Sequence, residues 1–427
     1  MNRTTVLRLA LLGAMSLLLA VPAAGYAGQS KKAAPQASCK LSVFSWWTGG
    51  GEAAGLTKLI KIWNTKNPTC KFSNEAVAGG AGSNAKAVLA QRLSANDPPD
   101  SFQGHAGKEL LDYIKAGQLE PIDSLFKDEG FDSVMPQQLL DQIRYQGHIY
   151  SVPVNIHRAN VLWYSPKVLQ QAGISTPPKT MAEFITDLGK VKAKGQIPLS
   201  MGEQWTSKHL LETVMLGDLG PEKWAALWKT GADWSGSDVT KALNDYAKVL
   251  SYTNSDAPSL TWQDASKLVV DGKAAFNIMG DWANGYFTEL NKKGKTDYGY
   301  VAVPGTDGVY MWLSDSFTLP KGAPNREGAL EWLKLVGSKD GQDAFNPVKG
   351  SIPARNDADA SKYNEYLQWA LGEWKKDKLA GSLTHGVVAS NAWNTDIDGA
   401  LGQFLQDKDV AKFQQRLVDA AKKHATA

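Results

Sequence analysis

The sequence predicts an α/β protein in which helices cover largely parallel sheets. Short apolar segments typical of strands alternate along the chain with segments whose apolar residues recur at helical spacing. No segment repeats with a period of roughly 20 to 50 residues, which argues against solenoids and propellers. With 427 residues, 43% of them hydrophobic and 21% charged, the chain has the composition of a globular protein of about two or three domains.

The first predicted strand–helix–strand unit carries both cysteines. Residues 41–44 and 72–77 read as strands, and apolar residues at helical spacing in 56–63 predict a helix between them. Cys39 and Cys70 each stand two positions before their strand, and adjacent parallel strands lie about 4.8 Å apart, within the range that a disulfide bridges. We therefore expect a structural Cys39–Cys70 disulfide. A lipid-modified Cys39 is the weaker alternative, and two cysteines are too few for a zinc site.

The same criteria predict the later elements. We expect helices over residues 85–95, 108–116, 181–194, 221–229, 238–251, 326–337 and 410–423, and strands over 149–154, 274–279, 298–303 and 316–319.

The N-terminal segment is typical of a secretory signal peptide. Arg3 and Arg8 precede an apolar run over residues 9–20, and Gly25 and Ala27 are the small residues that signal peptidase requires. The run is shorter than the roughly 20 residues needed to span a bilayer, so a membrane anchor is the weaker alternative. We expect cleavage near Ala27, followed by a flexible leader over residues 28–39.

Charge and motifs exclude several function classes. Lys and Arg number 46 against 43 Asp and Glu, which argues against a nucleic-acid-binding protein. The six histidines show no metal-ligand spacing, and the Gly79–Gly82 loop lacks the residues of a phosphate or dinucleotide site. No nucleophile elbow is present. We expect no metal, no cofactor and no enzymatic activity.

Residues 45–52, Ser-Trp-Trp-Thr-Gly-Gly-Gly-Glu, are the most informative segment. They follow the first strand and open the first helix, so Trp46, Trp47 and Glu52 belong at the carboxyl end of a sheet, where open α/β folds bind ligands. Adjacent residues on a strand point to opposite faces, so one tryptophan could instead be buried.

Five segments together resemble the bacterial ABC-transporter sugar-binding proteins, most closely the periplasmic glucose-binding branch of the group typified by maltose-binding protein. They are 45–52, 78–83, 152–158, 279–283 and 349–355. The resemblance covers essentially the whole chain after the signal peptide. It implies two α/β lobes joined by a hinge, with a ligand cleft between them: one lobe of residues 40–153 plus 317–348, the other of 154–316 plus 349–427.

The resemblance also implies the ligand-binding residues. Carboxylates accept hydrogen bonds from sugar hydroxyls, and aromatic faces contact the C–H surface of a pyranose. The implied set is Trp46, Trp47, Glu52, Gln103, His105, Trp262, Trp282, Asp315, Lys349 and His385. Gln103 departs from the Lys of some relatives, which leaves its role open.

Structural roles are the alternative for several of these positions. Asp281 could cap the helix that carries Trp282, Asp315 could pair with a surface lysine, and Lys349 could lie in a solvated turn. His385 alone would read as a surface histidine. Trp205, Trp312 and Trp393 could face the cleft or pack in the core, whereas Trp224 and Trp228, four apart, favour the core.

The function implied by the resemblance is capture of a monosaccharide, D-glucose above others, in the periplasm. The monomeric carrier would deliver it to a membrane permease served by a separate ATPase subunit. Mannose, galactose or xylose are the nearest alternatives. A secreted glycosidase could use Glu52 and Asp315 as its two carboxylates. A carrier for amino acids or peptides would need an arginine, for which Arg158 and Arg355 are the candidates.

Overall fold

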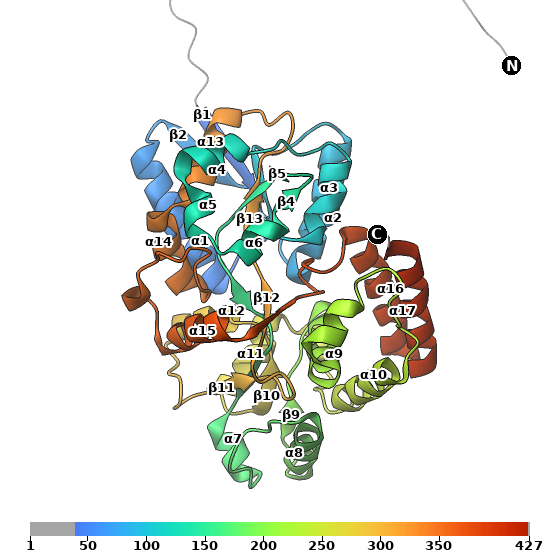
Figure 1. The fold of residues 1–427 in the computed structure, drawn as a ribbon. Coiled ribbons are helices and arrows are strands. Elements are labelled where there is room, and N and C mark those ends of the chain that lie inside the picture. The colour runs from blue at the N-terminus through green and yellow to red at the C-terminus, as the bar shows by residue number, and fades with distance from the viewer. Residues whose placement is uncertain (1–38, 426–427) are drawn as a thin grey trace, which may run out of the picture. The chain divides into compact units, whose positions relative to one another are not determined.

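The computed structural model describes residues 39–425, which form two lobes built on three larger β-sheets and the two-stranded sheet β4-β5 (Figure 1). The first sheet has the strand order β2-β1-β3-β13-β6. Its strands are β1 (Cys39–Phe44), β2 (Cys70–Asn74), β3 (Ser101–His105), β6 (Ser151–Pro153) and β13 (Asp315–Thr318). Strand β1 runs parallel to β2 and β3, whereas β13 is antiparallel to β3 and β6.

The helices of the first lobe come from both ends of the chain. Helix α1 (Gly50–Lys66) packs against α13 (Arg326–Gly337) and α14 (Lys339–Lys349), and α13 also contacts β6 and β13. Helix α2 (Ser83–Ser94) buries one stripe of apolar residues. The other short elements here are η1 (Gly80–Gly82), η2 (Lys108–Leu110), α3 (Leu111–Lys115), α4 (Asp123–Glu129), α5 (Phe131–Val134), α6 (Gln137–Gln142), β4 (Arg144–Tyr145) and β5 (His148–Ile149).

The second lobe contains the sheet β11-β8-β10-β9 and most of the remaining helices. The strands are β8 (Val161–Tyr164), β9 (Ile197–Leu199), β10 (Ala274–Ile278) and β11 (Gly299–Ala302). The helices are α7 (Pro166–Gln171), α8 (Met181–Ala193), α9 (Gln204–Ala226), α10 (Ser237–Leu250), η3 (Ala257–Ser259), α11 (Trp262–Val270), α12 (Trp282–Glu289), η4 (Ala360–Lys362), α15 (Glu365–Lys376), α16 (Asn391–Asp407) and α17 (Val410–His424).

A small third sheet has the strand order β14-β12-β7. Its strands β7 and β12 lie on the two stretches of chain that link the first sheet to the second. It contains β7 (His157–Arg158), β12 (Val309–Leu313) and β14 (Lys378–Gly381). Residues 151–164 run from the first sheet through β7 into β8, and residues 299–318 return from β11 through β12 into β13. In Figure 1, β12 accordingly stands midway between β13 above and β10 and β11 below.

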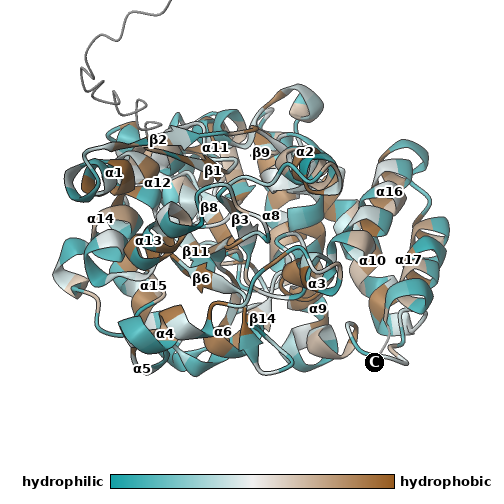
Figure 2. Cartoon of the chain, turned by 90° about the horizontal axis from the view of Figure 1, so that it is seen from above, coloured by the Kyte–Doolittle hydropathy of each residue, from teal (hydrophilic) through white to brown (hydrophobic). Residues whose placement is uncertain are grey.

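Amphipathic helices place their apolar faces inward, as the hydropathy colouring shows (Figure 2). In α10 the buried residues Val239, Leu243 and Tyr246 recur at helical spacing, and the helix packs on α9 and α17. Polar residues cover the opposite face. This periodicity is the reason why α10 was predictable from the sequence.

One sequence prediction is wrong and another is incomplete. The sheets are not largely parallel, because the chain crosses between lobes and returns, so β13, β6, β8 and β11 pair antiparallel with their neighbours. The predicted helix over 221–229 is confirmed for residues 221–226, which follow the non-helical Gly220 of α9, whereas the earlier part of α9 was not predicted. Almost every residue of α9 between 205 and 216 is buried, which removes the apolar–polar alternation that marks a helix.

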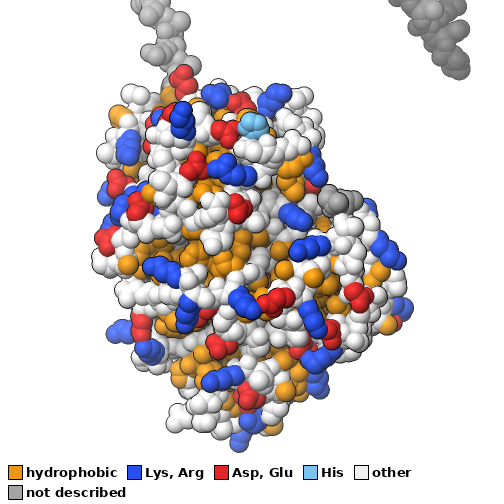
Figure 3. Space-filling model, in the orientation of Figure 1, with side chains coloured by type: hydrophobic (Ala, Val, Ile, Leu, Met, Phe, Trp, Pro, Cys, Tyr) orange, Lys and Arg blue, Asp and Glu red, His pale blue; other side chains and the backbone are white. Residues whose placement is uncertain are grey.

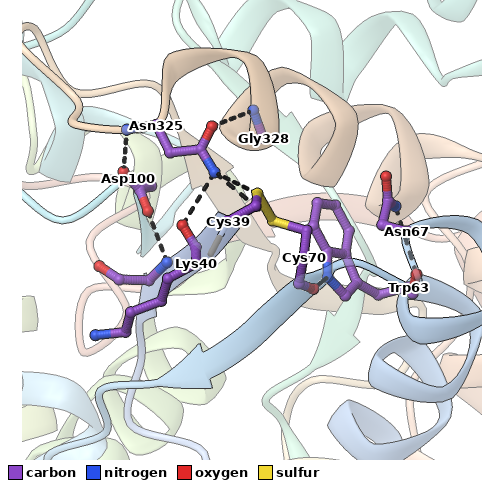
Figure 4. Close-up of a disulfide and its surroundings, with 9 residues drawn as sticks. Cys39, Lys40, Trp63, Asn67, Cys70, Asp100, Asn325 and Gly328 are labelled. Atoms are coloured by element: carbon purple, nitrogen blue, oxygen red, sulfur yellow. Dashed lines mark hydrogen bonds between the residues drawn. A yellow bond between two sulfur atoms is a disulfide. The ribbon is translucent and has the colours of Figure 1, made fainter. Parts of the chain in front are cut away.

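The predicted disulfide is confirmed. Cys39 and Cys70 are register partners in β1 and β2, and their Cα atoms lie 4.4 Å apart (Figure 4). Cys39 is thus the first residue of β1 and not part of the leader. The Asn325 side chain donates to Lys40 O at 3.0 Å and accepts from Gly328 N at 2.9 Å, which ties this corner of the sheet to α13.

The surface has no single dominant charge. Figure 3 shows basic and acidic side chains interspersed over one face of the molecule, in keeping with the net charge of +3. Among the helices that residues 39–425 form, none combines the length and the apolar character that a membrane span requires. The predicted signal peptide lies outside the described residues.

Candidate functional site: a cavity between the two lobes

A cavity of about 280 Å³ lies where the two lobes meet. The first lobe contributes the end of β1, the start of α1, the loop at 78–82 and the end of β3. The second contributes the starts of α9, α11 and α12 and the loop after β14. The principal lining residues are Trp46, Thr48, Glu52, Gly79, Gly80, Ala81, Gly82, His105, His157, Glu203, Trp205, Trp262, Gln263, Trp282, Asp315, Lys349 and His385.

Trp46 and the glycine loop form one wall. Trp46 leaves the end of β1, and its ring lies 5.1 Å from that of His105. A Cβ atom on Gly82 would lie 2.9 Å from the Trp46 ring, and the φ of Gly82 is +87°. Only glycine combines that backbone conformation with so close a contact, which explains why this loop is rich in glycine.

Tryptophans and His385 form the opposite wall. The Trp282 ring lies 5.1 Å from His385 and 6.3 Å from Trp205. Trp262, at the start of α11, packs 5.8 Å from Tyr286. A capping box fixes where α11 begins, since Thr261 exchanges hydrogen bonds with Asp264. The aromatic side chains are therefore set by helix starts.

Asp315 is the buried acid at the centre of the site. Its carboxylate accepts hydrogen bonds from Gln103 Nε2 and Asn155 Nδ2, both at 2.8 Å, and lies 3.3 Å from His157 Nε2. Burial alone would raise the pKa of Asp315, but its hydrogen bond with His157 and the charges of Lys349 and His157 lower the pKa well below its usual value. Asp315 is therefore ionised at neutral pH.

His157 joins Asp315 to a second buried acid, Asp281. His157 Nδ1 is hydrogen-bonded to Asp281 Oδ1, and the other Asp281 oxygen accepts from Arg158 N at 2.8 Å. Burial opposes protonation of His157, yet the Asp281 carboxylate outweighs burial and raises the pKa of His157. Asp281 stands at the start of α12 but makes no side-chain capping bond, so the interpretation of Asp281 as a helix cap is wrong.

Glu52 and Lys349 form an ion pair on the cavity wall, with Glu52 Oε1 3.1 Å from Lys349 Nζ. Burial raises the pKa of Glu52, and the Lys349 ammonium offsets only part of this rise. The Lys349 ammonium also lies 5.9 Å from the centre of the Trp282 ring. Lys349 Nζ thus lies close to both the Glu52 carboxylate and the Trp282 ring.

Glu109 fixes the orientation of His105. Its carboxylate accepts from His105 N and lies 2.8 Å from His105 Nδ1, while Lys86 Nζ donates to it at 2.6 Å. Burial would raise the pKa of Glu109, but Lys86 and His105 lower it to about 2. With Nδ1 engaged, the Nε2 edge of His105 is left 3.8 Å from Asp315 Oδ1, on the cavity side.

Eight of the ten predicted ligand-binding residues line the cavity: Trp46, Glu52, His105, Trp262, Trp282, Asp315, Lys349 and His385. Trp47 and Gln103 are not among the lining residues. Trp47, in the segment that follows β1, is buried against Phe317 and Phe345, whereas its neighbour Trp46 lines the cavity. Gln103 positions Asp315 and accepts from Trp46 N at 3.3 Å.

Other candidates are also placed. Arg158 is fully buried beside Glu373 and Asp377, and Arg355 pairs with Asp357, so neither lines the cavity. Trp205 faces the cavity, whereas Trp312 and Trp393 are buried elsewhere, and Trp224 and Trp228 pack together in the core as predicted.

Sequence reasoning did not single out His157, Glu203 and Gln263 as lining residues. His157 lies within the segment 152–158 that carried the resemblance, and the other two lie beside tryptophans already considered. Their position within or beside segments that were already singled out was therefore the only indication in the sequence that these three residues could line the cavity.

A second, larger cavity of about 690 Å³ adjoins the first. The two share Gly80, Ala81, Glu203 and Trp205, so the contact between the glycine loop and the start of α9 divides them. The second cavity is lined mainly by α2, α9 and α16, with Lys86, Asp112, Lys208 and Asp398 among its residues.

Relatives of this chain are extracellular binding proteins. Residues 47–343 match the family described as bacterial extracellular solute-binding protein. An uncharacterized ABC transporter extracellular-binding protein of Pyrococcus horikoshii is 34% identical over 99% of this chain and 97% of its own length. A probable sugar-binding periplasmic protein of Brucella suis is 33% identical over 93% of this chain and 96% of its own length.

Solved structures share the fold. The bacterial solute receptor AcbH, which has a preference for β-D-galactopyranose, superposes with a TM-score of 0.78 at 20% identity and covers 90% of this chain and 99% of its own. At this identity the likeness concerns the two-lobe fold alone. The family match over residues 47–343 and the 34% identity to the Pyrococcus horikoshii relative show that the chain belongs to the bacterial extracellular solute-binding proteins.

Proposed function

We propose that this protein is the sugar-binding subunit of an ABC transporter and holds one monosaccharide, D-glucose in the first instance, in the cavity between its lobes. The observation that carries the proposal is the composition of the cavity wall. Carboxylates, an ammonium and imidazoles line the same cavity as tryptophan rings, and both lobes contribute polar and aromatic side chains.

Each of these two kinds of side chain suits one aspect of a pyranose. Asp315 and Glu52 accept hydrogen bonds from hydroxyl groups, and Lys349 donates them. Trp282 and Trp46 offer faces for the C–H surface of the ring. A volume of about 280 Å³ lies near the lower end of the roughly 300–1,000 Å³ typical of ligand pockets, which favours one sugar ring over a chain of them.

The protonation states favour a carrier over a glycosidase. A glycosidase requires one carboxylic acid poised to donate a proton to the leaving oxygen. The pKa of Asp315 is held low, and although burial raises the pKa of Glu52, the Lys349 ammonium 3.1 Å from Glu52 Oε1 favours the ionised form, so we assign both carboxylates the role of hydrogen-bond acceptors. Binding without chemical change is the function that these residues support.

Ligand binding would act by closing the lobes. Residues 40–153 with 317–348 form one proposed lobe, and 154–316 with 349–427 the other. A sugar held between Glu52 and Trp282 gains contacts from both sides only when the lobes are together, so it favours the closed form by its differential affinity. The monomer, after removal of its signal peptide, would present this form to a permease in the inner membrane, with ATP hydrolysis in a separate subunit.

Sugar identity is the finer part of the proposal. The Brucella suis relative is described as a probable sugar-binding protein without a named sugar, and AcbH prefers galactose. Hexoses that differ by one hydroxyl orientation are separated only by which polar group each hydroxyl meets. Glucose is proposed on the motif resemblance and is the first sugar to test.

The test is a tryptophan-fluorescence and calorimetric titration of the protein lacking residues 1–27 with glucose, galactose, mannose, xylose and maltose, with analysis of the recovered sugar. We expect saturable binding of one glucose, unaltered afterwards, and loss of the response in Glu52→Ala and Trp282→Ala. Glu222→Ala, at an exposed surface pair with Lys378, is the matched control. Tighter binding of another sugar would replace the ligand, maltose would indicate use of the adjoining cavity, and cleavage of a glycoside would overturn the carrier function.

A further inference from the structure

Three buried side chains converge behind the tryptophan wall of the cavity. His209 and Glu212 lie on α9, and His385 lies on the loop that follows β14. All three are at least 95% buried. One ligand atom from each lies within 4.8 Å of the others. The sugar-binding proposal uses only His385 of this group, so it does not explain why the three side chains lie together.

The orientation of His209 is fixed by its backbone partner. His209 Nε2 lies 3.0 Å from Ala159 O, which can only accept, so Nε2 carries the proton. In the neutral imidazole, Nδ1 then bears a lone pair. That Nδ1 lies 3.1 Å from Glu212 Oε1 yet has no hydrogen-bond partner. Two lone pairs at this distance repel each other unless a positive charge lies between them.

Glu212 is anchored through its other oxygen. Oε2 accepts from Leu383 N at 2.6 Å and from Thr384 N at 3.0 Å. The Ser382 hydroxyl lies 2.9 Å from Oε2, 3.1 Å from Oε1 and 2.9 Å from His385 Nδ1, with one proton to give. When that proton goes to Oε2 and His385 carries its own proton on Nε2, Oε1 and both histidine Nδ1 atoms keep unshared lone pairs.

The spacing fits a metal ion. Two ligands that are each about 2.1 Å from a zinc ion stand roughly 3.0 to 4.2 Å apart. Glu212 Oε1 lies 3.1 Å from His209 Nδ1 and 4.0 Å from His385 Nδ1. Both distances fall within that range without movement of the side chains. Two imidazoles and one carboxylate are a donor set that suits Zn²⁺ and similar transition-metal ions better than Mg²⁺ or Ca²⁺.

We propose that His209, Glu212 and His385 bind one divalent transition-metal ion, of the Zn²⁺ class, at the wall of the cavity. Three protein ligands leave a coordination position open. The ion ties α9 to the loop 382–385, and the hydrogen bond from His209 Nε2 to Ala159 O orients the imidazole as an outer-shell partner does in metal sites. This site goes beyond the proposed sugar binding and does not depend on it.

A proton on His209 Nδ1, forming an ion pair with Glu212, is the competing explanation of the same geometry. The two explanations differ in what Glu212→Gln does. Its amide can donate to His209 Nδ1 while its oxygen still accepts from the Leu383 and Thr384 amides. The variant should therefore fold but lose the charged metal ligand.

The experiment uses tag-free protein lacking residues 1–27, stripped with a chelator and titrated calorimetrically with Zn²⁺, alongside Co²⁺ absorption spectroscopy. We expect one ion per chain and an intense visible spectrum typical of low-coordinate Co²⁺. Glu212→Gln and His209→Ala should each weaken Zn²⁺ binding at least tenfold. His148→Ala, which removes an exposed histidine beside Asp123, is the matched control and should bind as the unaltered protein does.

Several outcomes would overturn the proposal. These are the absence of Zn²⁺ binding at micromolar concentration, equal binding by Glu212→Gln, and Zn²⁺ anomalous scattering in crystals of the unaltered protein that lies away from these residues. The crystal measurement decides even where a variant fails to fold, as judged by circular dichroism. Sugar titration of the same samples keeps the two proposals separate, because glucose binding can fail while Zn²⁺ binding succeeds.

Discussion

Glu52 Oε1 lies 3.1 Å from Lys349 Nζ, although 297 residues separate them in the chain. The pair joins the first turn of α1 to the last turn of α14, two helices that pack along each other. The close fit nearby depends on residues without side chains. A Cβ on Gly51 would lie 3.1 Å from Lys349 O, and one on Gly285 would lie 2.4 Å from it. The charged pair is thereby held beside the start of α12, which carries Trp282.

Loss of either member of this pair should weaken sugar binding. A hydrogen bond to a charged group contributes about 1.5–3 kcal/mol, so Glu52→Ala and Lys349→Met should each raise the glucose Kd by roughly 10- to 100-fold. Isothermal titration measures this. Lys223→Met, which breaks an exposed pair with Asp238, serves as control and should leave the Kd unchanged. Unaltered affinity in both cavity variants would refute the assignment.

The adjacent tryptophans should respond in opposite ways. Trp46 lines the cavity, so Trp46→Ala should reduce glucose affinity and lower the free energy of unfolding less than Trp47→Ala does. Trp47 is 1% exposed and packs on Phe317 and Phe345, so Trp47→Ala should lower the free energy of unfolding by about 3–5 kcal/mol. Urea unfolding and glucose titration of both variants test the split. Equal effects on stability would contradict the placement of these two rings.

Glu109 should make stability depend on pH in the acid range. Its pKa is about 2 in the folded protein against an ordinary 4.5. A lowered carboxyl pKa stabilises the fold above pH 4.5, and this stability is lost as the pH falls toward 2, by up to about 3 kcal/mol. Urea unfolding between pH 6 and pH 3 should show a steeper loss for the unaltered protein than for Glu109→Gln. Parallel pH profiles would show that Glu109 is not the group responsible.

Reduction of the disulfide should destabilise the first lobe. Cys39 and Cys70 are 31 residues apart, and closing a loop of that length stabilises a fold by about 3–4 kcal/mol in the chain-entropy treatment. Cys39→Ser with Cys70→Ser should lower the free energy of unfolding by that amount, and added reductant should have no further effect on this double variant. Glucose affinity should remain, since neither cysteine lines the cavity.

Local periodicity and the recognised motifs predicted most of the features that depend on residues close together in the sequence. Strand β1, helix α10 and the Cys39–Cys70 bridge follow from spacing within short windows, and they are confirmed. The part of α9 before Gly220 was missed because burial on all sides erases periodicity. The antiparallel pairing of β13 with β3 was missed because it joins residues more than 200 positions apart.

The candidate site shows the same limit. Residues within the recognised segments were brought together as expected, but which of Trp46 and Trp47 faces the cavity depends on strand orientation. Gln103 was assigned to ligand because its loop was right, whereas its side chain is committed to Asp315. His209 and Glu212 were invisible as a cluster, since they meet His385 only through the packing of α9 on the loop after β14.

The residues that line the cavity extend from Trp46 to His385 in sequence, so a ligand in it contacts segments from nearly the whole chain. Neither lobe carries a complete wall, and a chain that stops before His385 or misfolds in one lobe offers no full set of contacts. Because ligand binds the native form and not the unfolded one, its binding energy is shared across both lobes. Saturating sugar should therefore merge any separate melting of the lobes into one cooperative transition.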